Sequence, residues 1–278
     1  MNVQAETSAG GVTARRGPGV LARAARRARL DVIGPPLATA ILVIVLWQLA
    51  TDIFQIKPYV LPSPVEVFEV YLHHFNLIWH NAKYTLWEAV LGFVIGCVAA
   101  WIFGMAMAAS RPLERSFLPF VVGSTTIPIV AVAPILILIL GIGIASKVAV
   151  TAFLCFFPMC INTLKGMRSS PAAAIELMHV QAASRWEELT KVRIPASLPY
   201  VFVGLRLAAA ASVIGAIIGE FVGAEHGLGY LIVQASYQLD APMMWASMFA
   251  SAVLGILMFV VVVVAERKIV HWHDAITQ

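Results

Sequence analysis

Residues 170–200 read SPAAAIELMHVQAASRWEELTKVRIPASLPY, and this stretch decides how the rest of the chain is organised. It is the longest polar segment after residue 36, and it lies between two hydrophobic blocks that are each long enough to cross a membrane. We therefore expect it to face water between two membrane spans.

The local pattern of this stretch predicts two short helices that meet at a bend. Ser170 followed by Pro171 predicts a helix start, because proline lacks the N–H that the first turn would leave unpaired. Ser184 and Glu187 fit a capping box, which predicts a second helix from Ser184. Pro195 predicts the end of that helix, since proline has no N–H for the helical ladder.

Apolar side chains recur at spacings of three and four through both predicted helices, so they would share one face if the bend is shallow. These residues are Ile175, Met178, Ala182, Trp186 and Leu189. The charged residues Glu176, Arg185, Glu187, Glu188 and Lys191 occupy other faces. An apolar stripe on a water-exposed helix pair indicates a surface that docks into a partner, or alternatively an amphipathic element that lies flat at the lipid interface.

The composition indicates an integral membrane protein. Of the 278 residues, 60% are hydrophobic and 12% are charged, whereas soluble domains carry about 25% charged residues. We expect an all-α polytopic fold with about six spans, at 37–54, 84–109, 118–140, 146–165, 199–221 and 243–265. The predicted domains are a basic cytoplasmic tail at 1–36, a transmembrane domain at 37–270 with its polar loop at 170–198, and a cytoplasmic C-terminal end at 271–278.

Positive charge is divided unequally between the two sides that these spans define. Of the 19 Lys and Arg residues, 15 fall in the amino-terminal tail and the other regions on its side, three fall in the opposite loops, and Arg206 lies within a span. Cytoplasmic loops of membrane proteins are enriched in Lys and Arg, so this bias predicts that both termini are cytoplasmic. The same segregation argues against nucleic-acid binding as the reason for the net charge of +4.

Cysteine and histidine patterns predict neither disulfides nor a metal site. The three cysteines, Cys97, Cys155 and Cys160, lie in apolar segments without a CxxC pair. The histidines that follow the first span have no carboxylate or cysteine partners at ligand spacing. The run VEVFEVYLHHF at 65–75 instead predicts a short helix on the outer face.

Two predicted spans carry unusual residues. Span 118–140 contains Pro119, Pro128 and Pro134, and proline inside a span often marks a broken helix along a transport route, with a simple packing kink as the alternative. Small residues four apart in span 199–221 favour close packing and a central place in the bundle. The candidate pathway or gate residues are Pro128, Pro134, Arg206, Ser212, Gly215 and Glu220. We expect Arg206 to snorkel or pair with an acidic group, and Glu220 to lie at the outer end, where it is a candidate gate residue.

The stretch 170–200 resembles the cytoplasmic coupling loop of ABC importer permeases. The signature of that loop is Glu-Ala-Ala, then Gly three residues later, and a closing Ile-x-Leu-Pro. Glu176 matches the Glu, Ala182 stands where the Gly would be, and VRIP at 192–195 matches the close conservatively. Since glycine supplies the bend without a Cβ penalty, an alanine held in the left-handed region would cost about 1 kcal/mol.

Further blocks resemble the nitrate, sulfonate and taurine branch of these permeases. They are LPSP at 61–64, TLWEAVLGF at 85–93, TIPIVAVAP at 126–134, FFPMCINT at 156–163, LPYVFVGLR at 198–206 and GLGYLI at 227–232. KVRIP at 191–195 and GAIIGEF at 215–221 are similar to members thought to import thiamine-precursor pyrimidines or other heteroaromatic nutrients. The resemblance covers residues 37–270 and implies a type I ABC importer permease fold.

The resemblance also implies partners and a mechanism. It implies a multi-pass subunit of the bacterial inner membrane that pairs with a second copy, a cytoplasmic ATPase dimer and an extracytoplasmic substrate-binding protein, and imports a small polar or heteroaromatic nutrient. Its implied ATPase-coupling residues are Glu176, Met178, Ala182, Ser184, Arg185, Trp186, Glu187, Leu189 and Pro195. The chain is then not an enzyme and binds no cofactor, because GxxxxGK[ST] is absent from it and ATP and Mg would bind the partner ATPase.

Two other functions remain as alternatives. A secondary transporter of a small solute, with 170–200 as an interfacial helix, would show inverted repeats and ionisable residues near mid-membrane, and the sequence has neither. A membrane-embedded enzyme would need a convergent set such as Ser with His at membrane depth. The histidines instead lie outside the predicted spans.

Overall fold

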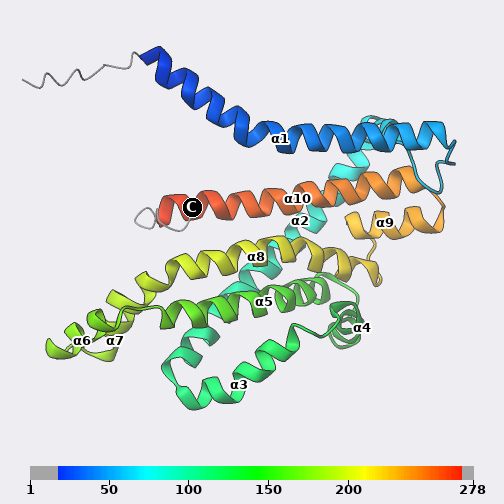
Figure 1. The fold of residues 1–278 in the computed structure, drawn as a ribbon. Coiled ribbons are helices and arrows are strands. Elements are labelled where there is room, and N and C mark those ends of the chain that lie inside the picture. The colour runs from blue at the N-terminus through cyan, green and yellow to red at the C-terminus, as the bar shows by residue number, and fades with distance from the viewer. Residues whose placement is uncertain (1–17, 271–278) are drawn as a thin grey trace, which may run out of the picture. The chain divides into compact units, whose positions relative to one another are not determined.

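The computed structural model describes residues 18–270, with side chains from residue 34 onward (Figure 1). All the regular elements in these residues are helical, as the sequence predicts. The chain divides into two compact units, residues 1–56 and residues 57–278. The predicted C-terminal end at 271–278 and residues 1–17 of the predicted basic tail lie outside the described residues.

Within the first unit, the described residues from 18 onward form the helix α1 (Pro18–Ile53). It runs through the adjacent Pro35 and Pro36, and its part from Gly34 to Ile53 is long and apolar enough to cross a membrane. This part coincides with the predicted span 37–54 to within a few residues.

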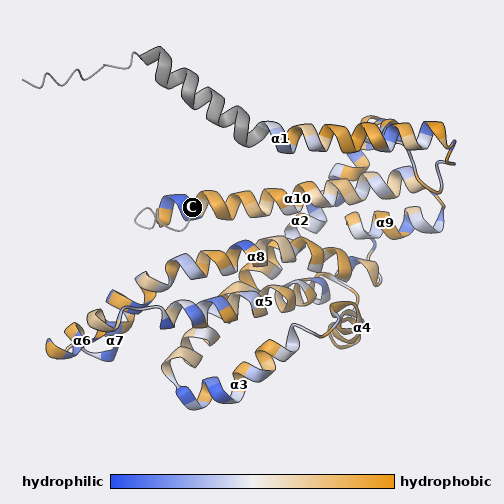
Figure 2. Cartoon of the chain, viewed as in Figure 1, coloured by the Kyte–Doolittle hydropathy of each residue, from blue (hydrophilic) through white to orange (hydrophobic). Residues whose placement is uncertain are grey.

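The second unit is a bundle of long helices joined by shorter ones (Figure 1). Its elements are α2 (Pro64–Ala109), α3 (Arg111–Ser124), α4 (Ile129–Leu140), α5 (Ile144–Arg168), α6 (Ala172–Val180), α7 (Arg185–Glu188), the π-helix η1 (Leu189–Arg193), α8 (Ile194–Phe221), α9 (Leu228–Tyr237) and α10 (Ala241–Ile269). Across residues 18–270, five helices qualify as membrane spans, or six if the bent pair α3–α4 counts as one. Figure 2 shows hydrophobic residues along α4 and α10, and hydrophilic ones at the start of α3 and at α6–α7.

Helix α2 is longer than the predicted span 84–109, because it includes the helix expected separately at 65–75. A capping box closes its start, where Ser63 Oγ accepts from the amide of Glu66 at 3.2 Å and the Glu66 carboxylate accepts from the amide of Ser63 at 2.7 Å. The backbone leaves helical geometry only at His74 (φ −116, ψ 21). A kink, and not a chain break, therefore separates the two parts.

Of the two alternatives for span 118–140, the broken helix is confirmed and the simple packing kink is wrong, because α3 and α4 are separate helices that meet at a bend of 105°. The hydroxyls of Thr125 and Thr126 donate to the carbonyls of Val122 and Gly123, each at 2.7 Å, and so compete with the continuing helical ladder. Pro128 then begins α4 in an extended conformation and has no N–H to donate. Pro134 lies inside α4.

Helix α5 lies between α2 and α8, and glycines on both neighbours allow the close approach. On α2, a Cβ at Gly92 would lie 2.3 Å from the Thr151 side chain, and a Cβ at Gly96 would lie 2.4 Å from the carbonyl oxygen of Ala152. On the other side, a Cβ at Gly215 of α8 would lie 2.7 Å from Cα of Thr151. The small residues of span 199–221 thus serve helix packing, and α8 also contacts α2, α9 and α10, which confirms its central place.

Candidate functional site

The polar stretch 170–200 forms a projecting helix pair, but its first helix is not capped as the sequence predicts. The predicted helix start is confirmed to within two residues, since α6 begins at Ala172. Pro171, and not Ser170, occupies the position before the helix, so the expected capping role of Ser170 was wrong. The Ser170 hydroxyl instead donates to the carbonyl of Met167 at 3.5 Å. This bond satisfies one of the last carbonyls of α5, which have no partner within their own helix.

The bend between α6 and α7 is built on Ala182, which has a φ of +52°. The amide of Ala182 donates to the carbonyl of His179, and the amide of Ala183 donates to the carbonyl of Met178, both at 3.0 Å. These two bonds make a Schellman motif, in which the left-handed residue normally is glycine. Ala182 therefore adopts the conformation that the coupling-loop signature gives to its glycine, at a cost of about 1 kcal/mol.

The predicted capping box at the start of α7 is confirmed. Ser184 Oγ accepts from the amide of Glu187 at 3.2 Å, and the Glu187 carboxylate accepts from the amide of Ser184 at 3.0 Å. The other carboxylate oxygen of Glu187 pairs with Lys191 Nζ at 2.8 Å. Because both charged groups of this pair are exposed, the pair contributes little to stability beyond the cap itself.

The predicted helix end at Pro195 was wrong, since α7 continues through η1 into α8 without interruption. In the π-turn the amide of Ile194 donates to the carbonyl of Leu189, five residues earlier. Pro195 then falls in the first turn of α8, where a missing N–H is tolerated. The helix pair is thus joined directly to a membrane-spanning helix.

The helix pair encloses a hollow of about 640 Å³ against the end of α2. Three of the five stripe residues, Ile175, Trp186 and Leu189, line it, whereas Met178 and Ala182 do not. Its other lining residues are Met105, Ala108, Ala109, His179, Ala183, Arg185, Glu188 and Arg193. Figure 1 shows α6 and α7 together at one end of α5 and α8.

The outer surface of the helix pair carries apolar side chains that the sequence reading did not select. These are Leu177, which is 57% exposed, and Val180, which is 83% exposed. Trp186, which the sequence did select, is 69% exposed on the same helix pair. The spacing of three between Leu177 and Val180 was the signal that could have identified this second face. Exposed apolar groups on a polar projecting element favour contact with another protein.

Three of the residues that line the hollow form ion pairs with one another. Glu188 lies between Arg193, whose guanidinium is 2.6 Å from its carboxylate, and His179, whose Nε2 is 3.4 Å from it. Glu176 is exposed on α6, with Arg185 on the first turn of α7. At the neighbouring end of α5, Arg168 pairs with the buried Glu114 of α3.

Comparison with known protein families identifies the chain. Residues 92–271 match the model of the family described as "Binding-protein-dependent transport system inner membrane component". The chain belongs to this family. It is the permease subunit of a binding-protein-dependent ABC importer, a multi-pass protein of the inner membrane.

Curated relatives of the permease carry several substrate names. It is 35% identical over 252 residues to the riboflavin transport system permease protein RibX of Chloroflexus aurantiacus, covering 90% of this chain and 94% of the relative. It is 33% identical over 239 residues to the formylaminopyrimidine transport permease protein ThiX of Halalkalibacterium halodurans, covering 85% and 95%. It is 29% identical over 236 residues to the putative aliphatic sulfonates transport permease protein SsuC of Bacillus subtilis, covering 84% and 85%.

The fold of the permease is also known from solved structures. A chain from inward-facing conformations of the MetNI methionine ABC transporter superposes with a TM-score of 0.60 and 21% identity, covering 71% of this chain and 96% of that chain. ATP hydrolysis in these systems belongs to a separate subunit, and the permease family binds no cofactor itself. Residues 34–270 contain no cluster of three or more metal-ligating side chains.

The predicted pathway residues of the permease lie apart. Pro128 precedes α4 and Pro134 lies inside it, whereas Ser212 and Gly215 are buried on α8, with Gly215 packed against α5. Arg206 pairs with Glu266 of α10, 3.3 Å from Nε to the carboxylate, as the pairing hypothesis expects. Ser212 donates to the carbonyl of Ala209 at 2.8 Å.

The largest contrast with the sequence reading is at Glu220, which is only 1% exposed. Thr85 and Asn81 of α2 lie beside it, and neither was selected from the sequence. No local pattern could have found them, because they precede their partners by well over a hundred residues. They became candidates only when the fold placed α2 next to the end of α8.

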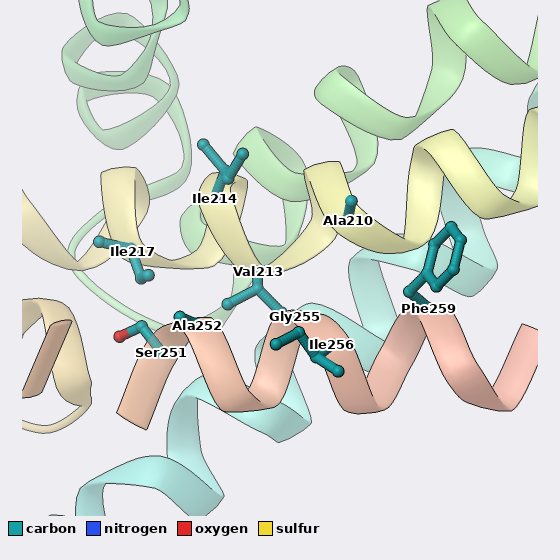
Figure 3. Close-up of a pocket in the computed structure, with 9 residues that line it drawn as sticks. All are labelled: Ala210, Val213, Ile214, Ile217, Ser251, Ala252, Gly255, Ile256 and Phe259. Carbon is teal, nitrogen blue, oxygen red and sulfur yellow. The ribbon is translucent and has the colours of Figure 1, made fainter. Parts of the chain in front are cut away.

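An apolar groove of about 400 Å³ lies between α8 and α10 (Figure 3). Its walls are Ala210, Val213, Ile214, Ile217, Ser251, Ala252, Gly255, Ile256 and Phe259. The Ser251 hydroxyl donates to the carbonyl of Ser247 at 2.8 Å, so it offers no free donor to a polar solute. This groove is therefore suited to apolar contacts and not to recognition of a polar nutrient.

Proposed function

We propose that this permease forms the translocation path for a heteroaromatic nutrient of the flavin or pyrimidine class and is driven by a separate ATPase through its loop 171–193. The observation that carries the coupling part is the direct helical connection from α7 through η1 to α8. A force applied to the projecting helix pair would act on a membrane-spanning helix without an intervening flexible linker.

The surface of the helix pair supports this assignment. The coupling residues are those predicted from the sequence, Glu176, Met178, Ala182, Ser184, Arg185, Trp186, Glu187, Leu189 and Pro195, joined by Leu177 and Val180. Ser184 and Ala182 set the shape of the pair, whereas the exposed Trp186, Leu177 and Val180 offer apolar contacts. The ATPase would accept these side chains in a groove.

The substrate class rests on the relatives. The permeases named for riboflavin and formylaminopyrimidine share 35% and 33% identity with this chain, against 29% for the aliphatic sulfonates relative. Heteroaromatic nutrients are therefore favoured over sulfonates, taurine and nitrate.

The assembly would contain two copies of this permease, with the path between them, and both termini in the cytoplasm. The excess of Lys and Arg on one side of the spans supports this orientation, since it places the loop 171–193 on the side where ATP is hydrolysed. The pathway role of Pro128, Pro134, Arg206, Ser212, Gly215 and Glu220 is part of this proposal, with the buried residues acting through packing and not as direct ligands.

The test is reconstitution of the permease with its ATPase and binding protein in vesicles, followed by measurement of ATP hydrolysis. Riboflavin and formylaminopyrimidine should stimulate hydrolysis, whereas an aliphatic sulfonate, taurine and nitrate should not. Stimulation by a sulfonate alone would contradict the substrate class and leave the importer assignment intact.

A double variant tests the coupling loop in the same assay. Trp186→Ala with Leu189→Ala should abolish the stimulation and weaken co-purification of the ATPase, because the two large apolar side chains at the start of the continuous helix are removed. The matched control is Trp79→Ala, which removes a tryptophan that is also about half exposed but lies 26 residues before Met105 on α2. Equal behaviour of the two variants would contradict coupling through residues 171–193.

A further inference from the structure

The first turn of α9 is held by side chains from two other helices. Its amides at Gly227, Leu228 and Gly229 donate in succession to Asn81 Oδ1 at 2.8 Å, Thr85 Oγ1 at 2.8 Å and Glu220 Oε2 at 2.5 Å. The residue before α9 is glycine, which has no side chain with which to cap the helix. Three orphan donors of the helix start are thus satisfied entirely from α2 and α8.

The side chains that accept these bonds are themselves tied together. Thr85 Oγ1 donates to Glu220 Oε1 at 2.7 Å, so both carboxylate oxygens of Glu220 are engaged. Asn81 Nδ2 donates to the carbonyl of Leu77 at 2.9 Å, which turns its oxygen toward Gly227. Asn81, Thr85 and Glu220 are 3%, 0% and 1% exposed. We call these three side chains and the amides 227–229 the α9 latch.

The latch explains the Gly-Leu-Gly sequence at 227–229. A Cβ at Gly227 would lie 2.2 Å from the Glu220 carboxyl group, and the φ of Gly227 is +118°. A Cβ at Gly229 would lie 2.7 Å from the carbonyl oxygen of Ile217. Both glycines are required because the carboxyl group of α8 comes into contact with the backbone of α9.

A second polar contact ties α5 to the same region. Lys147 Nζ lies 3.2 Å from Oε1 of Glu88, which follows Thr85 by three residues on α2. Lys147 also packs against α8, since a Cβ at Gly219 would lie 3.0 Å from its Cα. Around the latch, the middle of α2, the start of α5 and the end of α8 are therefore fixed to one another.

Helix α8 connects the latch with the projecting helix pair. It has 28 residues, about 42 Å, and it continues η1 and α7 at one end and carries Glu220 one residue before the other end. Figure 1 shows α6–α7 and α9 at opposite ends of α8. Beyond α9, Asp240 caps α10 by accepting from the amide of Met243 at 3.0 Å.

We propose that the α9 latch transmits displacement of α8 to α9, with Glu220 and Thr85 as positioning residues for the transport cycle. This rests on the proposed coupling through residues 171–193. Movement of α8 shifts α9 because Glu220 of α8 accepts directly from the amide of Gly229 and is joined through the Thr85 hydroxyl to the amide of Leu228. Without these bonds, only the loop 222–226 would connect the two helices, and α9 would not have to follow α8.

The test is a distance measurement in the reconstituted complex of permease, ATPase and binding protein. Spin labels are attached at Tyr237→Cys of α9 and Ile142→Cys before α5, both of which replace exposed side chains, whereas the native cysteines of residues 34–270 are buried. Addition of Mg-ATP with vanadate should shift the label distance in the wild-type background. Thr85→Val and Glu220→Gln should lose this shift while still co-purifying with the ATPase.

The chain provides a matched control for Thr85→Val. Thr163→Val makes the same change at another threonine that is 0% exposed and whose hydroxyl has no hydrogen-bond partner. It should keep the shift, and Thr85→Ser, which retains the hydroxyl, should restore it. Retention of the shift in Thr85→Val would overturn the proposal.

Hydrogen exchange gives a readout that does not depend on the ATPase. The amides of Leu228 and Gly229 should exchange about tenfold faster in Thr85→Val than in Thr163→Val, the factor expected for one lost buried hydrogen bond. Unchanged exchange would overturn the latch itself. A wild-type complex that shows no ATP-dependent shift, with the exchange difference intact, would instead contradict the proposed coupling and leave the latch as a static contact.

Discussion

The two ends of the continuous helix α7–η1–α8 are stabilised in different ways. At the projecting end the polar contacts join close neighbours in the chain, as in Glu187 with Lys191 and Glu188 with Arg193, and the side chains are exposed or half-buried. At the opposite end Glu220 is buried and contacts Thr85, 135 residues earlier. The side chains at the projecting end are thus exposed to a partner, whereas Glu220 at the other end already contacts residues of its own chain.

This difference predicts unequal costs of substitution. Breaking an exposed local pair should lower the free energy of unfolding only a little, because water replaces the lost partner. Breaking a buried long-range contact should lower the free energy of unfolding more, because the remaining polar group stays buried without a partner.

Lys147→Met should cost about 3–5 kcal/mol of unfolding free energy, because it leaves the carboxylate of Glu88 buried and unpaired. The measurement is thermal or denaturant unfolding of the purified permease in detergent. Adding Glu88→Gln should recover most of the lost unfolding free energy, because it removes the unpaired carboxylate charge. A single variant as stable as the wild type would show that this end is not held by buried contacts.

Gly227→Ala should cost about 2–4 kcal/mol, since its Cβ meets the Glu220 carboxyl group and its φ of +118° disfavours any side chain. Gly255→Ala is the control, because a Cβ there has nothing within 4 Å, and it should be neutral or slightly stabilising. The same unfolding assay compares the two. Similar midpoints for both variants would mean that the latch tolerates a wider separation of α8 and α9.

Ala182→Gly should stabilise the helix pair by up to about 1 kcal/mol, because glycine adopts a φ of +52° without a Cβ penalty. Ala173→Gly makes the same change inside α6 and should destabilise that helix by about 0.5–1 kcal/mol. Hydrogen exchange of the amides of α6 and α7 measures both. Changes of the same sign would contradict the left-handed assignment at Ala182.

The sequence was informative where contacts are local. The capping box at Ser184 and the bend at Ala182 depend on residues within five positions of each other, so their patterns are visible in the chain. The all-helical membrane fold follows from composition in the same way. Small residues in span 199–221 likewise predicted a closely packed central helix, which α8 is.

Sequence reasoning failed where an irregular turn changes the effect of a proline. Pro195 did not end a helix because the π-turn before it moved proline into a first turn. In span 118–140 the prolines indicated a break, but its place was not predicted, because it also depends on Thr125 and Thr126, which bond their own backbone before Pro128. The α9 latch could not be predicted from local patterns, since Asn81 and Thr85 lie about half the chain length before the residues that they contact.

The position of α5 between two glycine-bearing neighbours has a consequence for synthesis of the protein in the cell. When α5 enters the bilayer, α2 is already present to cover one of its faces, but α8 is still on the ribosome or inside it. The face of α5 at Thr151, which packs against Gly215 in the folded protein, is therefore exposed to lipid until α8 is inserted. A bulky residue at position 215 would therefore leave insertion of α5 unaffected and disturb the later step, the packing of α8 against α5.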